Sequence, residues 1–424
     1  MDITNLSEAL DKIIDYRGKT PKKLGGEWSK EGHRALSALN VKSSGLEKLD
    51  QIKFVDSTLY KKWMTDEVRR GDILLTSEAP AGQVHYWDSN EKIVLSQRLF
   101  ALRVNDNFDA RYLSYYLKSS TGQKAILDKI SGSTVSGISA KMFDHIPVIK
   151  LELPVQKSIG KVLSILDSKI ELNNKINAEL EAMAKLVFNY WFVQFDFPDK
   201  DGKPYKSSGG KMVWSEELKR DIPHGWNVQE LRAEVEIQRG ISYTSIEINN
   251  QGVPMINLNS FNLDGTYKHD GLKTYSGKYS SNNIASPGEL LIAATDVTRN
   301  ADIIGKAILV PDYYDDDLVF SMDIAKVKSS NIPSSFLMLL FNSKHYHNYI
   351  KYYATGTLVL HLNLEGLKRY KISLPPESLL DRFDSLYVEI ANRVYKTTNE
   401  NQKLAELRNW LLPMLLNGQV KVKS

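Results

Sequence analysis

Two similar stretches of sequence, GDILLT at residues 71–76 and GELLIA at residues 288–293, lie about half the chain apart. Other short matches occur in the same order in both halves: Arg17-Gly18 with Arg239-Gly240, Leu39-Asn40 with Leu258-Asn259, Gly132-Ser133-Thr134 with Gly356-Thr357-Leu358, and Leu153-Pro154 with Leu374-Pro375. A repeat of this length predicts two similar domains. It suggests one task that is performed twice, on a target with two parts.

The composition is typical of a globular protein with more than one domain: the chain has 424 residues, of which 42% are hydrophobic and 25% charged. Cysteine is absent, which excludes disulfides and thiolate-bound metals and is compatible with a reducing cytosol. Residues 1–19 do not resemble a secretory signal and no apolar run is long enough to cross a membrane, so we expect a cytoplasmic protein without membrane contact. The net charge of +4 permits nucleic-acid binding but supports it only weakly.

Each half ends in a segment whose apolar residues recur at alternating spacings of three and four, the pattern of a coiled-coil seam. The first stripe, interrupted by the polar residues Lys169 and Asn173, consists of Ile159, Val162, Leu166, Ile176, Leu180, Met183, Val187 and Tyr190. The second follows Pro375-Pro376 and consists of Phe383, Tyr387, Ile390, Val394, Thr397, Asn401, Leu404 and Leu411. The interruptions predict a polar layer that fixes the register, and Pro413 is expected to end or kink the second helix.

The two helices are expected to pair with each other, because each would otherwise expose an apolar stripe. An antiparallel pair would relate the two halves by a pseudo-two-fold axis. The alternative is that each helix packs on its own domain, since surface helices of globular domains also carry apolar stripes. The first helix would have roughly 35 residues and be about 50 Å long.

The predicted fold class is α+β: two similar mixed α/β domains separated by two long antiparallel coiled-coil helices, with pseudo-two-fold symmetry. Within the first domain, residues 71–76 and 93–104 indicate strands and residues 111–130 a helix. The boundaries expected along the chain are 1–152 for the first domain, 153–195 for the first helix, 196–225 for a linker or hairpin arm, 226–375 for the second domain and 376–424 for the second helix.

Motifs for catalysis are missing from the sequence. GGKM at residues 209–212 lacks the upstream glycine and the following Ser or Thr of a phosphate-binding loop. LPPE at residues 374–377 is not the Asn/Asp-Pro-Pro-aromatic turn of amino-methyltransferases. His345 and His347 are two residues apart and would diverge on a helix, so we expect neither a metal site nor catalytic residues.

Five segments resemble the specificity subunits of Type I restriction–modification systems. They are LPVQKSIG at 153–160, LDSKIELN at 166–173, NYWFVQFDF at 189–197, GKPYKSSGG at 202–210 and IPHGW at 222–226. The resemblance covers nearly the whole chain in the family's order and is specific in the helices and the arm. It is weak in the two recognition domains, and the entry to the second helix lacks a counterpart of Gln156.

The resemblance implies a non-catalytic subunit that binds double-stranded DNA with a split target sequence, each target-recognition domain reading one half. It implies two methyltransferase (modification) subunits as partners, which use S-adenosylmethionine to methylate adenine N6. It also implies translocase-endonuclease (restriction) subunits. This chain itself would bind no cofactor.

Base reading requires Arg or Lys for guanine and Asn or Gln for adenine, displayed on loops. Repeat-equivalent turns and strand ends supply the candidates, for each of which the alternative is a solvated surface side chain. Ser96 and Ser321 hold matching places, which sets Gln97 and Arg98 opposite Met322 and Asp323. The candidates of the first domain are Arg17, Lys19, Thr20, Lys22, Ser77, Gln83, Gln97, Arg98, Ser133 and Thr134; those of the second are Arg239, Thr244, Asn257, Asn259, Thr295, Thr298, Arg299, Lys306 and Thr357.

An aromatic cluster closes the first helix and includes Tyr190, Trp191, Phe192 and Phe195. One interpretation is a docking surface for a partner subunit, because aromatic residues are enriched at interfaces. The other is a local core that anchors the helix end against the second domain.

Two domains on a helical rod would act as a ruler, since about 50 Å is roughly one and a half turns of B-DNA. The rival hypothesis is a two-headed adaptor that binds proteins and has no DNA role. A fused single-chain restriction enzyme is a third possibility, against which the missing catalytic motifs argue.

Overall fold

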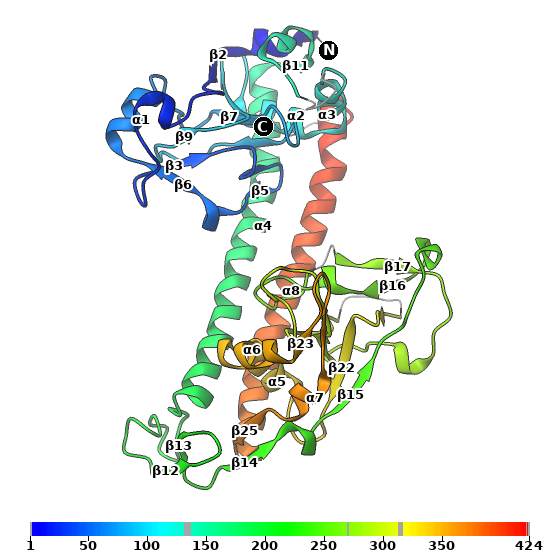
Figure 1. Cartoon of the computed structure of the whole chain (residues 1–424). Coiled ribbons are helices and arrows are strands. Elements are labelled where there is room, and N and C mark those ends of the chain that lie inside the picture. Colours follow the sequence, from blue (N-terminus) through cyan, green and yellow to red (C-terminus); the bar gives the residue numbers. More distant parts are fainter. Residues whose placement is uncertain (1, 131–136, 269–270, 313–316, 421, 423–424) are drawn as a thin grey trace. The chain divides into compact units, whose positions relative to one another are not determined.

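The computed structural model describes residues 2–130, 137–268, 271–312, 317–420 and 422. The chain divides into two compact units (Figure 1): unit 1 consists of Met1–Leu172 and Asn401–Ser424, and unit 2 of Asn173–Glu400. Both contain sheets and helices, and two long helices contribute to both. The expected class, two mixed domains with a long central and a long C-terminal helix, is confirmed.

Unit 1 is built around an antiparallel four-stranded sheet in the order β2-β10-β7-β8. A three-stranded sheet, β6-β3-β9, contains one parallel pair, β3 with β9. The strands are β1 (Asp2–Asn5), β2 (Leu10–Asp15), β3 (His33–Leu36), β4 (Val41–Lys42), β5 (Gly45–Leu46), β6 (Lys53–Val55), β7 (Ile73–Thr76), β8 (Val84–Tyr86), β9 (Val94–Leu95), β10 (Leu99–Val104) and β11 (Pro147–Lys150); the short helices are α1 (Ser57–Trp63), α2 (Ala110–Lys118) and α3 (Ser120–Leu127).

Unit 2 repeats this topology, with the sheet β15-β22-β18-β20 and the sheet β17-β16-β21, in which β16 and β21 are parallel. A hairpin, β12–β13, forms in the predicted arm. The strands are β12 (Met212–Ser215), β13 (Arg220–Pro223), β14 (Asn227–Glu230), β15 (Glu236–Arg239), β16 (Ile248–Ile256), β17 (Lys273–Tyr275), β18 (Leu290–Ala293), β19 (Thr295–Asp296), β20 (Ala307–Leu309), β21 (Val319–Phe320), β22 (Ile324–Lys328), β23 (Ala354–Thr355), β24 (Leu360–Leu362) and β25 (Lys371–Leu374); the short helices are α5 (Ser334–Phe341), α6 (Lys344–Ile350) and α7 (Leu364–Lys368).

The similar stretches at residues 71–76 and 288–293 contain the fully buried strands β7 and β18. In each, the acidic residue after the glycine pairs with a basic residue of the neighbouring strand. Asp72 lies 2.8 Å from Arg103, and Glu289 lies 2.7 Å from Lys326. The carboxylates therefore neutralise positive charge within the sheets, which explains why both halves keep an acid at this position.

Three of the sequence matches are out of register in the structure. Arg239 pairs with Ala325 at the place where Asp15 pairs with Phe100, so Arg239 lies two residues away from its predicted match, Arg17. The parallel strand pairs Leu36–Leu95 and Ile256–Phe320 are structurally equivalent. Counted from these pairs, Leu39 corresponds to Asn259 and not to Leu258, the residue with which the sequence comparison matched it. Likewise β11 and β25 each end two residues before a long helix, so Leu153 corresponds to Glu377 rather than to Leu374. Short identical dipeptides matched by chance because the loops around them differ in length.

The two long helices are α4 (Leu153–Phe188), which continues into a π-helical turn (Asn189–Val193), and α8 (Glu377–Leu416). Helix α8 runs three residues past Pro413, so the proline does not end it. The predicted stripe of α8 is confirmed where Phe383, Ile390 and Thr397 are buried. The predicted stripe of α4 is wrong in part, because Met183 and Tyr190 are exposed whereas Leu163, Ala184 and Phe188 are buried.

The helices pair with each other and run antiparallel within each unit, so the alternative of separate packing is not what forms. In unit 1, Arg408 of α8 lies 2.6 Å from Asp167 of α4, which also accepts a hydrogen bond from Tyr115. Leu412, Leu415 and Leu416 join Ile159 and Leu163 in the same core.

The predicted polar layer is present in unit 2. The Asn173 amide donates to Glu400 at 2.8 Å, the Asn177 amide donates to Thr398 at 3.2 Å, and Thr397 is hydrogen-bonded to Asn177. Buried amide and hydroxyl pairs fix the register of two helices, because any slip leaves polar groups buried without partners.

The segment predicted as one helix at 111–130 is two helices, α2 and α3. Ser119 has extended backbone angles, and its side chain accepts a hydrogen bond from Gly122. A serine that caps a new helix start ends the preceding helix, although the apolar spacing continues across it.

Replacing Phe192 by Ala is expected to destabilise unit 2 by about 3–5 kcal/mol, the usual effect of emptying a buried aromatic site. Phe192 is buried and its ring centroid lies 4.9 Å from that of Phe336 and 5.1 Å from that of Phe383. Hydrogen exchange along a urea series, measured on peptides of residues 226–375, reports the change. Trp214→Ala, in the exposed part of the arm, is the control and should change little; equal effects of both variants would contradict the predicted core role.

Candidate nucleic-acid interface

One edge of the unit 1 sheet gathers several of the predicted DNA-binding residues. Strands β2 and β7 end there and β10 and β8 begin there, because Phe100 pairs with Asp15, Leu99 with Thr76, and Val84 with Leu75. The loops that leave this edge carry Arg17, Ser77, Gln83, Gln97 and Arg98. We call this edge, with its loops, the reading edge of unit 1.

Arg17 is held in place by several contacts at this edge. Its guanidinium lies 2.7 Å from Asp15, donates to the carbonyl of Ile138 at 3.3 Å, and lies 3.9 Å from the centre of the Phe100 ring. Burial alone would raise the pKa of Asp15, but the hydrogen bonds and charge of Arg17 outweigh it and lower this pKa. A partly buried and neutralised arginine of this kind orients a loop at least as much as it attracts phosphate.

Arg98 is an exposed cation of the reading edge. Its backbone is left-handed, with φ of 62°, and its carbonyl accepts a hydrogen bond from Ser77 at 2.9 Å. The guanidinium Nε lies 3.3 Å from the Glu78 carboxylate, and 47% of the side chain is exposed. Its neighbour Gln97 is exposed as well, whereas the side-chain oxygen of Gln83 is used by the Ser43 amide.

The other candidates of unit 1 lie on the loop after β2 or outside the described residues. The Lys19 ammonium donates to the carbonyl of Trp63 at 2.9 Å, and the Thr20 hydroxyl accepts from the Lys23 amide. Lys22 is exposed. Ser133 and Thr134 fall among residues that the structure does not describe.

Unit 2 has an equivalent reading edge, where β15 and β18 end and β22 and β20 begin. Arg239 donates to the carbonyl of Leu362 at 3.3 Å, as Arg17 does to Ile138. The Ala293 amide donates to the Lys306 carbonyl, as the Thr76 amide does to Gln83. The repeat therefore extends to the hydrogen bonds that shape the loops.

Lys306 occupies the place of Gln83 and is partly buried. Burial lowers its pKa and the positive charges of Lys185 and Lys351 add to the effect, although Asp264 opposes it. Arg299 and Thr357 are exposed, and Thr357 lies in the turn between β23 and β24.

Several predicted residues have side chains whose hydrogen bonds are already used within unit 2. Thr244 caps a helical turn with Glu247, and the Thr298 hydroxyl accepts from the Asp302 amide. Asn259 accepts from Lys268 at 3.2 Å. Three predicted residues have buried side chains: Ser77 in unit 1, and Asn257 and Thr295 in unit 2. Buried side chains suit positioning of the loops rather than direct contact with a base.

Two acidic residues at the reading edges were missed by the sequence prediction. Glu78 is paired with Arg98 in unit 1, and Asp323 accepts a hydrogen bond from Thr295 at 3.0 Å in unit 2. Acids are discounted when DNA is the expected target, but Asp323 was already set opposite Arg98 by the matching places of Ser96 and Ser321. That alignment was the signal that could have found it.

The aromatic cluster at the end of α4 belongs largely to the core of unit 2. Trp191, Phe192 and Phe195 are buried there, and Phe195 packs at 5.4 Å against Trp226. Their burial agrees with the interpretation as a local core. Tyr190 is exposed and is the member of the cluster that a partner could reach.

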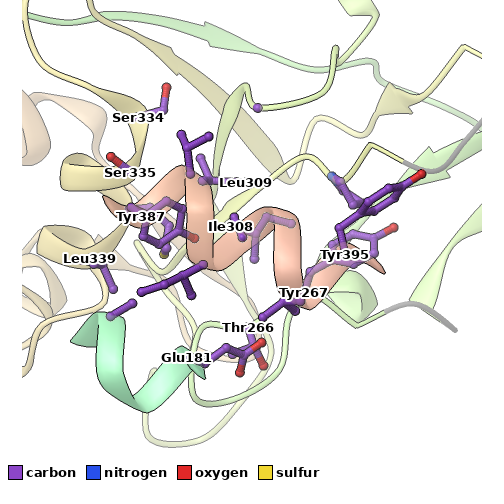
Figure 2. Close-up of a pocket in the computed structure, with 18 of the residues that line it drawn as sticks. Glu181, Thr266, Tyr267, Ile308, Leu309, Ser334, Ser335, Leu339, Tyr387 and Tyr395 are labelled. Carbon is purple, nitrogen blue, oxygen red and sulfur yellow. The ribbon is translucent and has the colours of Figure 1, made fainter. Parts of the chain in front are cut away.

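A pocket of about 560 Å³ lies within unit 2, between α5, β20 and the two long helices. Figure 2 shows Tyr387 and Leu339 toward one side of it and Tyr267 and Tyr395 toward another. Burial raises the pKa of Glu181, which Lys185 opposes. Among the lining residues, the Ser335 hydroxyl donates to the Asp384 carboxylate at 2.6 Å, and we assign the pocket no chemistry.

Within the described part of the chain, no three His, Asp or Glu side chains lie together in a way that could hold a metal ion. Among the same residues, none of the helices has the length and apolar character that a membrane span requires.

Comparison with known proteins agrees with this arrangement. The family model described as "Type I restriction modification DNA specificity domain" matches residues 59–182 and 223–409, more than half of the chain. The chain therefore belongs to this family, the specificity (HsdS) subunits of Type I restriction–modification systems, whose role is DNA recognition. Such subunits are generally non-catalytic and work with other subunits and DNA.

Individual relatives cover most of the chain at low identity. The MjaIX specificity subunit of Methanocaldococcus jannaschii is 25% identical over 84% of this chain and 79% of its own length. The HindI specificity subunit of Haemophilus influenzae is 25% identical over 83% of this chain and 87% of its own length. The crystal structure of the S subunit from M. genitalium shares the fold, with a TM-score of 0.57 at 14% identity, covering 98% of this chain and 95% of that one.

Proposed function

We propose that unit 1 and unit 2 each read one half of a bipartite double-stranded DNA sequence with their reading edges. The observation that carries the proposal is the repeated edge, in which the backbone hydrogen bonds are the same and the exposed side chains differ. The same backbone hydrogen bonds hold the loops of both units in similar conformations. Because the exposed side chains on these loops differ, the two units select different half-sites.

The paired helices are proposed to set the length of the unread spacer between the half-sites. Helix α4 has 36 residues, which is about 54 Å at 1.5 Å per residue, or roughly one and a half turns of B-DNA. The polar layer of Asn173, Asn177 and Thr397 supports a fixed length, because it resists sliding of one helix along the other.

Two methyltransferase subunits are proposed to dock on the helices, one for each unit. Apolar side chains of the long helices are exposed in both units: Ile165 and Leu172 of α4 with Trp410 of α8 in unit 1, and Val388 of α8 with Leu186 of α4 in unit 2. Exposed apolar residues that recur on equivalent elements favour two similar docking surfaces. S-adenosylmethionine and the methylation of adenine N6 belong to these partners, and cleavage to restriction subunits; this chain contributes recognition.

Co-expression with the methyltransferase is expected to yield a complex of one specificity chain and two methyltransferase chains, measured by size-exclusion chromatography with light scattering. Alone, the chain should bind DNA weakly, because a net charge of +4 attracts phosphate only modestly. An electrophoretic shift with and without the partners measures this. A one-to-one complex that methylates both half-sites would contradict equivalent docking, and no DNA binding in any complex would favour the adaptor hypothesis.

A further inference from the structure

We propose that one position of the reading edge, Arg98 in unit 1 and Asp323 in unit 2, reads a base pair in each half-site with opposite hydrogen-bond polarity. Arg98 donates to guanine in the half-site of unit 1, and Asp323 accepts from the amino group of cytosine in the half-site of unit 2. The inference rests on the proposed function, and it names the residues that make the two half-sites differ.

The two positions are structurally equivalent. The Ser77 amide donates to the Arg98 carbonyl at 2.9 Å, and the Ala294 amide donates to the Asp323 carbonyl at 2.7 Å. Arg98 directly precedes β10 and Asp323 directly precedes β22. Each of these strands is the second in the strand order of its sheet. Each site also has a polar partner at the same place on the neighbouring strand end, Glu78 or Thr295.

The geometry of Arg98 suits contact with a base. The Glu78 carboxylate lies 3.3 Å from the guanidinium Nε, and 47% of the Arg98 side chain is exposed. A guanine offers two acceptors, O6 and N7, that match two parallel N–H donors. The backbone at Arg98 is left-handed, with φ of 62°, a conformation that a glycine would adopt at lower cost.

The geometry of Asp323 suits the opposite contact. Its Oδ1 accepts from the Thr295 hydroxyl at 3.0 Å, which fixes the orientation of the carboxylate, and the side chain is half-buried. A carboxylate near DNA is repelled by phosphate, and a donor on a base edge offsets that repulsion. Cytosine N4 is the donor that aspartate recognises in the major groove.

The test maps the methylated motif of the full complex with its methyltransferase partners, by sequencing genomic DNA from cells that express each variant. Arg98→Ala should reduce discrimination at one G·C pair in one half-site by about 5–150-fold and leave the other half unchanged. Asp323→Ala should do the same in the other half-site. Lys219→Ala, an exposed residue of the arm, is the matched control and should leave the motif unchanged.

Two further variants separate base reading from support of the fold. Arg98→Gln should shift the preference at that position from guanine toward adenine, which a structural role would not do. Thr295→Glu combined with Asp323→Arg places the unit 1 pair in unit 2 and should introduce guanine at that position of the second half-site.

Methylation of an unchanged motif by Arg98→Ala, or a loss of specificity spread over several positions, would overturn the inference. If Arg98→Ala fails to fold, Arg98→Gln decides, and an unchanged motif there overturns the inference equally. The proposed function fails in a different way: the wild-type complex would then methylate no bipartite motif, or a change in unit 1 would alter both halves.

Discussion

A chimera in which residues 1–150 come from another family member should methylate a sequence with one new half and one old half. The effect is the largest we expect, because the original site is lost completely and a new site appears. The physical reason is that unit 1 has its own sheets, core and reading edge. The junction falls in the connection between β11 and α4, so the long helices stay intact.

The chimera must preserve contacts between the new domain and the retained helices. Leu412, Leu415 and Leu416 of α8 belong to the core of unit 1, and Tyr115 donates to Asp167 of α4. The donor domain should therefore supply apolar residues and a tyrosine at these places. The methylated motif is read by sequencing genomic DNA, and a change in both halves of the motif would refute modular recognition.

Insertion of four residues into both long helices is expected to lengthen the spacer by about two base pairs, since four helical residues add about 6 Å. The insertions belong between Leu172 and Asn173 and between Glu400 and Asn401, where each helix passes from one unit to the other. The hydrogen bond between Asn173 and Glu400 can then re-form beyond the inserted turn. Methylation at the original spacing should fall by on the order of 100-fold or more, because the reacting groups are displaced by several ångströms.

A single insertion in α4 alone is the informative control. An insertion in only one helix puts α4 and α8 out of register on one side of it, so either the Asp167–Arg408 pair of unit 1 or the Asn173–Glu400 hydrogen bond of unit 2 is lost, and the variant should be destabilised. Methylated motifs of the double variant show the preferred spacer directly. A folded, active double variant that keeps the original spacer would rule out the ruler.

The repeat and the long helices could be predicted from the sequence because both are periodic. The α8 stripe was right since its apolar residues, such as Phe383 and Ile390, are also its buried ones. The α4 stripe was partly wrong since the seam there contains a small Ala184, whereas large apolar residues such as Met183 face solvent. Hydrophobicity alone does not separate a helix–helix seam from a surface that a partner covers.

The candidate site could be located by sequence but not resolved into roles. Arg17, Arg98 and Arg239 were found because they lie at turns or strand ends of the repeated sheet. Their hydrogen bonds depend on residues far away in sequence, as between Arg17 and Ile138, and such pairings follow from the tertiary fold. The burial of Ser77, Asn257 and Thr295 likewise became visible only with the neighbouring strands in place.

The central claim, that the two units read two halves of one split DNA sequence, is tested most directly by the methylated motif of the wild-type complex. The chain is co-expressed with its methyltransferase partners in a host without adenine methylation of its own, and modified adenines are mapped across the genome. We expect a single motif of two short specified blocks of different sequence, with an unspecified spacer of constant length between them. A continuous motif, a spacer of variable length or two identical blocks would contradict it.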